Sequence, residues 1–588
     1  MSVPKFRFYA PVILTACIVL ASGCGRGGRD EREYASIEKE FIAQYLKTNP
    51  SAATMIGDHR YDDRLEDMSA EAVESYVRAC GGYLERLQAV DAEALPRDRA
   101  IDARYLAQNI ELILLDLGEE RAHRRNPMLY VETLSHSIYI ILINQSIPLE
   151  ERLESIARRL EHVPRFIDQA TANLDNPPKL RTETAIDMTK GLIAYIESDV
   201  LPEADKIPGM GERVRRSFGP AREALLAYQS FLEKDLINRS FGEIRLGDES
   251  FRKRFALALG TDLTPEAVVE GAYRELDAAH ERMFALAAPL YEEIFGTAIP
   301  PEPEFGERMR IVAAVLENIS NDHPKRGGML EAYSAAYAEA EAFVRERGLL
   351  ALPEVPLNIR EIPPFIPASS VVISVSPGPL DRGGSYYFMV APVPEYWGAE
   401  QAERFLREYN TQMIRVMTIH EAMPGHFVQL AYANRHPSLV RAAFWNPAFV
   451  EGWAVYCQDM MKEQGFLDGD PRFGLVAEKY RLRTVINVLL DSGMHRENMT
   501  EVEAVRLMTQ EGFQSGSEAL MKWRRRVGIS PCYLSSYFVG ALEIRSIRED
   551  AQREWGERFT LKEFHERLLE CGSVPTKYAR EILLGADR

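Results

Sequence analysis

The sequence predicts a mainly α, multi-helical protein with one small antiparallel β-sheet in its second half. Three observations lead to this prediction. Apolar residues recur at three-and-four spacing through most of residues 31–350, which is the pattern of amphipathic helices. Prolines and short β-rich runs then occupy residues 352–394. Helical patterning returns from Ala399 and continues almost to the last residue.

The first residues have the features of an exported lipoprotein. Lys5 and Arg7 precede an apolar stretch from about residue 10 to residue 21, which is too short to be a good membrane span. The stretch runs into Leu20-Ala21-Ser22-Gly23-Cys24, which resembles a bacterial lipobox. We therefore predict a signal peptide over residues 1–23, lipidation at Cys24, a flexible polar tether over 24–34, and a location on the extracytoplasmic side of the bacterial cell envelope.

Other interpretations of this segment remain open. Leu14-Thr15-Ala16-Cys17 is a second run of lipobox type, but cleavage before Cys17 would leave three apolar residues on the mature chain. An ordinary secretory signal or an uncleaved anchor would also fit. All of these place the protein outside the cytoplasm. The cysteines beyond residue 24 are too few for a disulfide framework: Cys80, Cys457, Cys532 and Cys571. One bridge is possible in an oxidising compartment, but the separations do not identify a pair.

An N-terminal helical region is predicted over residues 35–350. Its helices are separated by prolines and glycines such as Pro50, Pro177-Pro178 and Pro208-Gly209. The predicted helices are Ile37–Leu46, Ala70–Val90, Asp98–Leu117, Leu149–Asn173, Thr182–Asp199, Gly211–Lys234, Thr264–Tyr291 and Gly328–Arg347.

The region 351–588 is predicted to contain the sheet, a functional helix and further helices, in one continuous body with the first region. The β-rich runs are Leu357–Ile362, Val371–Val375 and Tyr386–Val390. The formal net charge of the chain is −18, which argues against nucleic acid or anionic lipid as the main partner. Contact with a membrane is expected only through the N-terminal lipid.

The heptapeptide His420-Glu421-Ala422-Met423-Pro424-Gly425-His426 has the residues of a zinc-hydrolase helix at an unusual spacing. In the common motif the two histidines are four residues apart on one helical face, and the glutamate is the general base. Six residues on a regular helix would leave the two histidines about 120° apart and about 9 Å apart along the axis. A regular helix through this segment would therefore hold no metal ion.

The residues between the histidines indicate that the helix is irregular. Pro424 lacks an N–H, and its ring would collide with the carbonyl group of His420, four residues earlier. Gly425 follows and tolerates unusual dihedral angles. We therefore predict a distortion between Met423 and His426 that returns both histidines to one metal ion.

A third ligand is expected, because catalytic zinc usually has three protein ligands and a water molecule. Glu451 lies 25 residues after His426 within an otherwise apolar run, where a buried carboxylate needs a partner. The alternative is a solvated or salt-bridged helix residue. Glu421 follows the first histidine directly and is the expected general base.

These residues carry a family resemblance. His-Glu-x-x-Pro-Gly-His, followed by Glu451-Gly452-Trp453-Ala454, resembles the bacterial family catalogued as domain of unknown function 885, which is placed among the zincin-like, gluzincin-type metallopeptidases. Weaker similarities follow in the same order along the chain: Pro50–Thr54, Arg382–Tyr387, Asp491–His495 and Ser536–Gly540.

The resemblance implies a helical body around a deep groove, with His420, His426 and Glu451 binding one zinc ion. In zincins a strand before the metal helix holds the substrate backbone, so Tyr386 and Tyr387 are substrate-binding candidates. Tyr537 and His495 are candidate oxyanion donors by motif position. Arg483 and Arg545 are candidates for binding a substrate carboxylate, although helical arginines are more often solvated or paired.

The expected function is zinc-dependent hydrolysis of short peptides. Two alternatives remain: a non-catalytic lipoprotein that serves as a binding or scaffold module, and a metal hydrolase that cleaves a non-peptide amide.

Overall fold

In a computed structural model of the chain, which describes residues 12–362, 371–381, 383–524 and 530–585, the fold is mainly helical, as predicted. The helices before the sheet are α1 (Val12–Thr48), α2 (Pro50–Met55), α3 (Ala70–Gln88), α4 (Arg97–Ile113), α5 (Ala122–Arg125), α6 (Pro127–Ile143), α7 (Leu149–Asn173), α8 (Lys179–Tyr195), α9 (Leu201–Asp205), α10 (Met210–Lys234), α11 (Asp248–Leu259), α12 (Pro265–Phe295), α13 (Phe305–Ile319) and α14 (Met329–Arg347).

The helices after the sheet are α15 (Ala399–Glu408), α16 (Thr411–Glu421), α17 (His426–Ala433), α18 (Leu439–Ala443), α19 (Pro447–Glu463), α20 (Pro471–Arg496), α21 (Glu501–Arg506), α22 (Gly516–Lys522), α23 (Ser535–Trp555), α24 (Leu561–Glu570) and α25 (Thr576–Leu584). Short 3-10 or π-helical segments are η1 (His59–Tyr61), η2 (Ala92–Ala94), η3 (Leu114–Glu119), η4 (Ile196–Val200), η5 (Leu236–Arg239), η6 (Phe466–Gly469), η7 (Leu507–Glu511) and η9 (Gly556–Arg558).

The sheet has three strands, β1 (Leu357–Glu361), β2 (Val372–Val375) and β3 (Tyr386–Val390), in the order β1-β3-β2. It is mixed, so the prediction of an antiparallel sheet is wrong for one pair. β2 runs antiparallel to β3, whereas β1 runs parallel to it. The reason is strand order: the chain reverses direction from strand to strand, and β1 pairs with β3 instead of with β2.

Successive side chains of β3 enter two different cores, as the alternation of a strand requires. Phe388 and Val390 belong to the main core, and Tyr387 and Met389 belong to a small core on the opposite face. Helix α14 packs against β1 and β3, while α16 contacts β2, and α17 contacts β2 and β3. The sheet thus lies directly against the two helices that carry the histidines.

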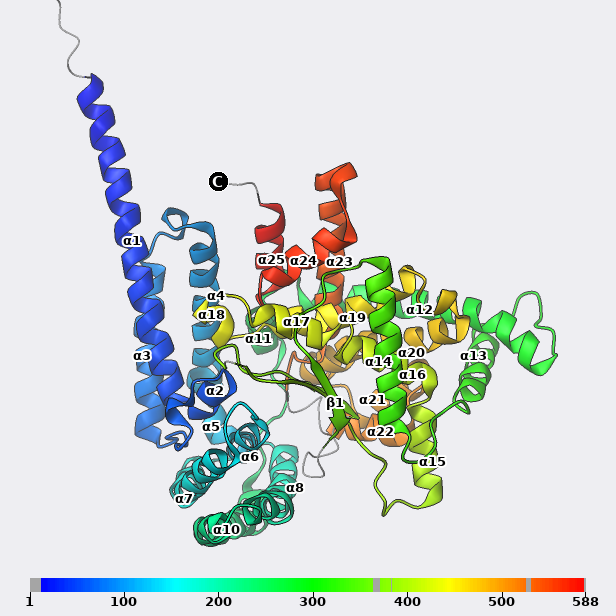
Figure 1. Cartoon of the computed structure of the whole chain (residues 1–588), viewed down its shortest axis with the longest axis horizontal. Coiled ribbons are helices and arrows are strands. Elements are labelled where there is room, and N and C mark those ends of the chain that lie inside the picture. Colours follow the sequence, from blue (N-terminus) through cyan, green and yellow to red (C-terminus); the bar gives the residue numbers. More distant parts are fainter. Residues whose placement is uncertain (1–11, 363–370, 382, 525–529, 586–588) are drawn as a thin grey trace, which may run out of the picture.

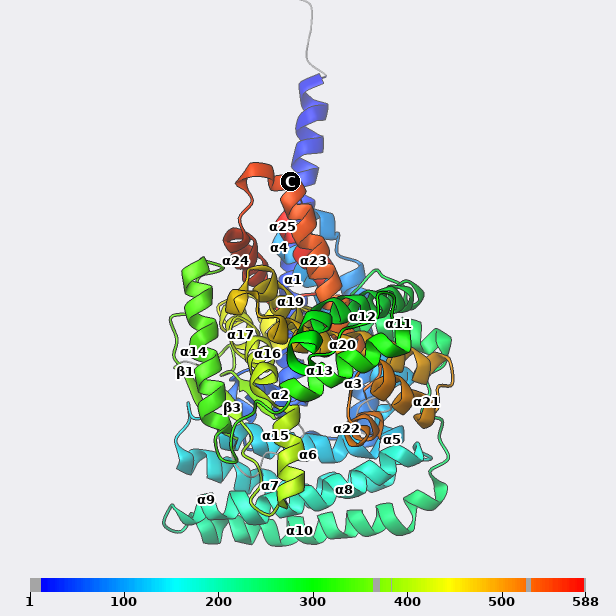
Figure 2. The same cartoon turned by 90° about the vertical axis from the view of Figure 1, so that its right-hand side faces the viewer.

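The main core joins both regions of the chain, from Tyr34 of α1 to Leu583 of α25. A second core forms mainly between α6, α7, α8, α9 and α10. These helices appear as a separate layer at the bottom of the molecule in both views (Figures 1 and 2). The long α1 projects from the body at the opposite end (Figure 1).

Helix α1 continues through residues 24–34, which were predicted to form a flexible tether. Cleavage of a signal peptide and lipidation of Cys24 stay predictions. Within the described part of the chain, no helix is both long enough and apolar enough to cross a bilayer. The cysteines at 80, 457, 532 and 571 are all free and buried.

Candidate metal centre

The heptapeptide contains the predicted break in the helix. Helix α16 ends at Glu421 and α17 begins at His426. The N–H groups of Ala422 and Met423 both donate to the carbonyl oxygen of Thr418, at 2.9 and 3.0 Å. The Met423–Pro424 peptide bond is cis. The two histidines therefore occupy the end of one helix and the start of the next.

Close packing fixes this break. A Cβ atom at Gly425 would lie 1.8 Å from the carbonyl oxygen of His420, so a side chain at this position would force the backbone apart. On the other side, the indole N–H of Trp453 donates to the carbonyl oxygen of Pro424 at 2.9 Å. Trp453 is fully buried in α19. The backbone path between the histidines is thus held by the helix that also carries Glu451.

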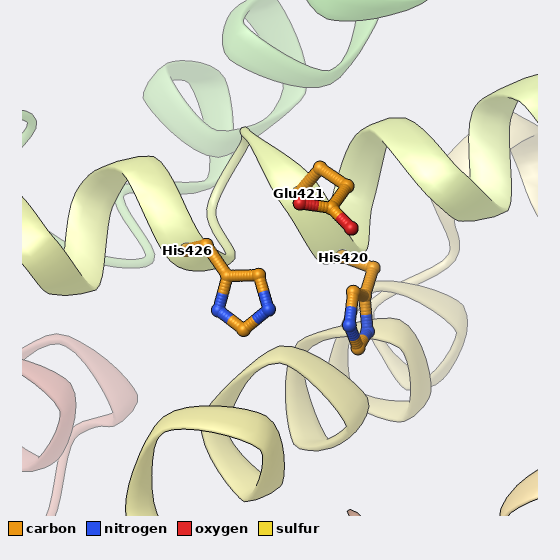
Figure 3. A group of neighbouring side chains, drawn as sticks. All are labelled: His420, Glu421 and His426. Atoms are coloured by element: carbon orange, nitrogen blue, oxygen red, sulfur yellow. The ribbon is translucent and has the colours of Figure 1, made fainter. Parts of the chain in front are cut away.

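The histidines and Glu451 converge, as predicted. Glu451 Oε2 lies 3.4 Å from His420 Nε2 and 3.5 Å from His426 Nε2. The two imidazole rings are 4.8 Å apart and nearly perpendicular. Figure 3 shows His420, Glu421 and His426 pointing toward a common space from the two ends of the break. A ligand atom from each of these three residues lies within 4.8 Å of the others.

These separations match the requirements of zinc. Ligands at about 2.0–2.1 Å in tetrahedral geometry are about 3.3–3.4 Å from one another. Glu451 Oε2 is buried and has no hydrogen-bond partner among the described residues. Such an atom is costly unless it binds a cation. His420, His426 and Glu451 therefore fit a zinc ion by both distance and chemistry.

The ionisation states also suit a cation. Burial opposes the charge of Glu451, but the nearby imidazoles of His420 and His426 outweigh it and hold the pKa of this carboxyl well below its usual range. Burial raises the pKa of Glu421, and the two histidines oppose this effect only in part. Of the two carboxyl groups, Glu421 is therefore the one that binds protons more readily.

Glu421 is largely enclosed but keeps more contact with solvent than the two buried histidines. Its backbone carbonyl accepts a hydrogen bond from the Ser374 hydroxyl of β2. Its side chain lies beside both histidines, with a carboxylate oxygen within 4.8 Å of a ring nitrogen of each (Figure 3). The carboxylate of Glu421 therefore lies beside both histidines, and its role as a general base stays a prediction.

Three tyrosines surround the cluster. The Tyr537 ring stacks on His420 at 6.2 Å, and the Tyr480 ring lies 5.7 Å from the same imidazole. Burial, together with neighbouring carboxylates, raises the pKa of both phenols, so both remain neutral donors. Tyr533 donates to Glu451 Oε1 at 2.7 Å. The structure brings the predicted Tyr537 to the site, and it adds Tyr480 and Tyr533.

The predicted His495 lies elsewhere. Its ring stacks on Phe251 of α11 at 5.9 Å. It is 15 residues beyond Tyr480 on α20, which corresponds to about 22 Å along the helix axis. The structure therefore does not bring His495 to the histidine pair, and its candidacy as an oxyanion donor is not supported by the geometry.

The two predicted arginines are paired with carboxylates. Arg483 forms ion pairs with Glu408 and, at 3.2 Å, with Glu518. Arg545 is paired with Asp459. The paired interpretation is therefore correct, and neither guanidinium group is free to receive a substrate carboxylate without breaking a partly buried ion pair.

Tyr386 and Tyr387 are buried in β3, the central strand. The Tyr386 hydroxyl accepts a hydrogen bond from Asn434 Nδ2 at 3.2 Å, and Tyr387 donates to Gln145. The edge strand beside the histidines is β2, which contacts α16 and α17. The predicted substrate-binding residues therefore lie on β3, whereas the strand with a free edge beside the histidines is its neighbour β2.

No sequence pattern identifies Tyr480 as a site residue. For Tyr533, a pattern that could have placed it near Glu451 is the pair of glycine-containing motifs on α19 and α23. Two glycines, Gly452 of α19 and Gly540 of α23, meet where these helices cross: a Cβ at Gly540 would lie 1.7 Å from the Ala448 carbonyl oxygen. These glycines sit in the two motifs Glu-Gly-Trp-Ala and Ser-Tyr-Phe-Val-Gly. Their contact implies that the helix of Glu451 and the segment before Ser536 are neighbours.

Comparison with known proteins agrees with this architecture. A candidate lipoprotein of unknown function from Shewanella oneidensis has a similar structure, with 29% sequence identity, a TM-score of 0.79, and coverage of 94% of this chain and 99% of that one. A candidate lipoprotein from Colwellia psychrerythraea shares the fold at 17% identity, with a TM-score of 0.77 and coverage of 94% and 98%. No curated protein matches the chain. The family model described as "Bacterial protein of unknown function (DUF885)" matches residues 50–583, and the chain belongs to this family.

Proposed function

We propose that this protein is a zinc-dependent peptidase of zincin-like type, which hydrolyses short peptides on the extracytoplasmic face of the cell envelope. One observation carries the proposal: Glu451 Oε2 lies 3.4 and 3.5 Å from the Nε2 atoms of His420 and His426, the spacing of ligands around a tetrahedral zinc ion. These three residues would hold one zinc ion. The lipoprotein descriptions of both structural relatives support a lipid anchor at Cys24.

A zinc ion in this site would polarise a carbonyl group and lower the pKa of a water molecule. Glu421 would accept the proton of the attacking water and pass it to the leaving amine. Burial raises the pKa of Glu421, which makes its carboxylate a stronger base than an ordinary glutamate. Tyr537 and Tyr480 stay protonated and would donate a hydrogen bond to the developing oxyanion.

An extended peptide would bind along β2. The Ala391 N–H donates to the Val371 carbonyl oxygen at 2.7 Å. The backbone N–H and C=O groups of Val371, and of every second residue after it, therefore point toward β3. The backbone groups of Val372 and Ser374 then point away from β3. In the described part of the chain, β2 is an edge strand, and such an edge accepts an added strand. Ser374 contacts the backbone of Glu421, so the bound peptide would pass the general base.

The decisive experiment compares Glu421→Gln with the wild type on a library of short peptides. We expect a loss of about 10²–10⁴-fold in kcat with zinc binding retained, because Glu421 is not a ligand in this proposal. Glu400→Gln is the matched control, since Glu400 is an exposed carboxylate at the start of α15.

Three results would count against the proposal. Wild-type protein that binds zinc but turns over no peptide, while cleaving other amides in a Glu421-dependent manner, would indicate a non-peptide amidohydrolase. Equal turnover of wild type and Glu421→Gln would refute the role of the base. Absence of both zinc and turnover would indicate a non-catalytic binding module.

A further inference from the structure

The two carboxylate oxygens of Glu451 have different partners. Oε2 faces His420 Nε2 and His426 Nε2 at 3.4 and 3.5 Å. Oε1 accepts the hydroxyl hydrogen of Tyr533 at 2.7 Å. Tyr533 lies just before α23, more than 80 residues after the glutamate. The phenol therefore holds the carboxylate in an orientation that presents one oxygen to the histidines.

We propose that Tyr533 is a positioning residue that restricts Glu451 to metal binding through Oε2 alone. The inference rests on the proposed zinc site. A carboxylate can bind a metal through one oxygen or through both, and a phenol bonded to Oε1 disfavours the second mode. One-oxygen binding keeps the number of protein donor atoms at three, which leaves the fourth position of a catalytic site open. Groups that orient a ligand in this way typically contribute 10–100-fold to metal affinity.

The segment that carries Tyr533 is firmly held. Asp491 of α20 accepts hydrogen bonds from the Cys532 N–H at 3.0 Å and from the Ser535 hydroxyl at 2.7 Å. The Tyr533 carbonyl oxygen accepts hydrogen bonds from the Ser536 N–H at 3.0 Å and hydroxyl at 2.6 Å. These contacts fix the backbone on both sides of the tyrosine, so its hydroxyl is presented to Glu451 without a large cost in side-chain ordering.

The close crossing of α19 and α23 sets the distance between the two residues. Gly452 follows Glu451 directly, and a Cβ on it would lie 2.4 Å from the Gly540 carbonyl carbon. The helices can approach this closely only because both positions are glycines. Without that approach, the Tyr533 hydroxyl could not reach the carboxylate.

The test is zinc affinity measured by competition with a chromophoric chelator. We expect Tyr533→Phe to bind zinc 10–100-fold more weakly than the wild type. The matched control is Tyr456→Phe, on the same helix as Glu451. It loses a buried 2.8 Å hydrogen bond to His565 and should keep the wild-type zinc affinity within twofold.

A second readout separates positioning from general stabilisation. In cobalt-substituted protein, Tyr533→Phe frees Oε1, so we expect a higher coordination number and weaker visible absorption, whereas Tyr456→Phe should keep the wild-type spectrum. In a Glu451→Gln background, Tyr533→Phe should cause no additional loss of affinity. If Tyr533→Phe does not fold, Ser535→Ala loosens the same segment and should weaken zinc binding to a smaller extent.

The inference is overturned if Tyr533→Phe, or Ser535→Ala where it must be used, retains the zinc affinity and the cobalt spectrum of the wild type. This failure differs from failure of the proposed function. Wild-type protein that binds no zinc would remove the metal site itself, whereas tight wild-type binding unaffected by Tyr533→Phe would remove only the positioning role.

Discussion

Replacing Gly425 with alanine tests the broken helix on which the metal centre depends. The added Cβ would lie 1.8 Å from the His420 carbonyl oxygen, whereas real contacts of this kind are at least 3.0 Å. The backbone must therefore move by about 1.2 Å, the difference between these two distances. The ligand atoms of both histidines are only 3.4–3.5 Å from Glu451 Oε2, so this displacement is a third of the spacing that defines the site.

Functional geometry must be kept within about 0.5 Å, and a 1 Å misplacement can cost about 100-fold. We therefore expect Gly425→Ala to weaken zinc binding by at least about 100-fold and to abolish turnover of any peptide that the wild type cleaves. Chelator competition gives the affinity, and circular dichroism checks that the helical content is unchanged.

The control is Gly82→Ala in α3. A Cβ there meets no atom within 4 Å, and alanine is favoured over glycine inside a helix by about 0.5–1 kcal/mol. This variant should bind zinc like the wild type and be slightly more stable. If Gly425→Ala binds zinc with wild-type affinity while folded, the break is not needed for the site, and the reasoning from the heptapeptide is refuted.

Three further predictions follow from the same structure. Gly540→Ala places a Cβ 1.7 Å from the Ala448 carbonyl oxygen, so it should destabilise the protein by about 1–3 kcal/mol and weaken zinc binding. Denaturant unfolding measures the first effect and chelator competition the second. Wild-type values of both the unfolding free energy and the zinc affinity would contradict the close crossing of α19 and α23. Burial lowers the pKa of His565 from its ordinary value of about 6.5 to about 4. Its contribution to stability is therefore present above about pH 6.5 and is lost as pH falls toward 4, by about 3 kcal/mol in total. His565→Gln should flatten this pH dependence in chemical denaturation, and an equally steep dependence would show that other groups cause it. Chelation should lower the unfolding free energy of the wild type, by about 4 kcal/mol where free zinc had been 1,000 times its Kd, but should not affect His426→Ala; equal shifts in calorimetry would place the metal elsewhere.

Local patterns predicted much of the helical framework. Helix α7 has the predicted bounds, because its apolar residues keep one face from Leu149 onward and Pro148 marks its start. Strand β3 also has its predicted bounds. Helix α6 was not predicted because apolar residues occupy most of its positions and leave no amphipathic stripe to detect.

Partners that are distant in sequence could not be predicted in the same way. The alternation of a strand does not say which neighbour it pairs with, so the parallel pairing of β1 with β3 is not readable from the chain. Arg483 and Arg545 are ordinary helical arginines in sequence, and only the fold shows that Glu408 and Asp459 neutralise them.

In the metal centre, too, features set by neighbouring residues could be predicted from the sequence, and features set by long-range packing could not. The break between His420 and His426 follows from Pro424 and Gly425, which act on their own neighbours in the chain. Tyr533 and Tyr480 reach the site only through the crossing of α19, α20 and α23, which depends on packing over the whole second half of the chain.

Anomalous diffraction at the zinc edge, from crystals of wild-type protein purified without chelator, would locate a zinc ion bound by His420, His426 and Glu451. We expect one strong peak about 2.0–2.1 Å from His420 Nε2, His426 Nε2 and Glu451 Oε2. The absence of a peak at this position, or a fully occupied zinc ion bound elsewhere on the chain, would contradict the proposed zinc site.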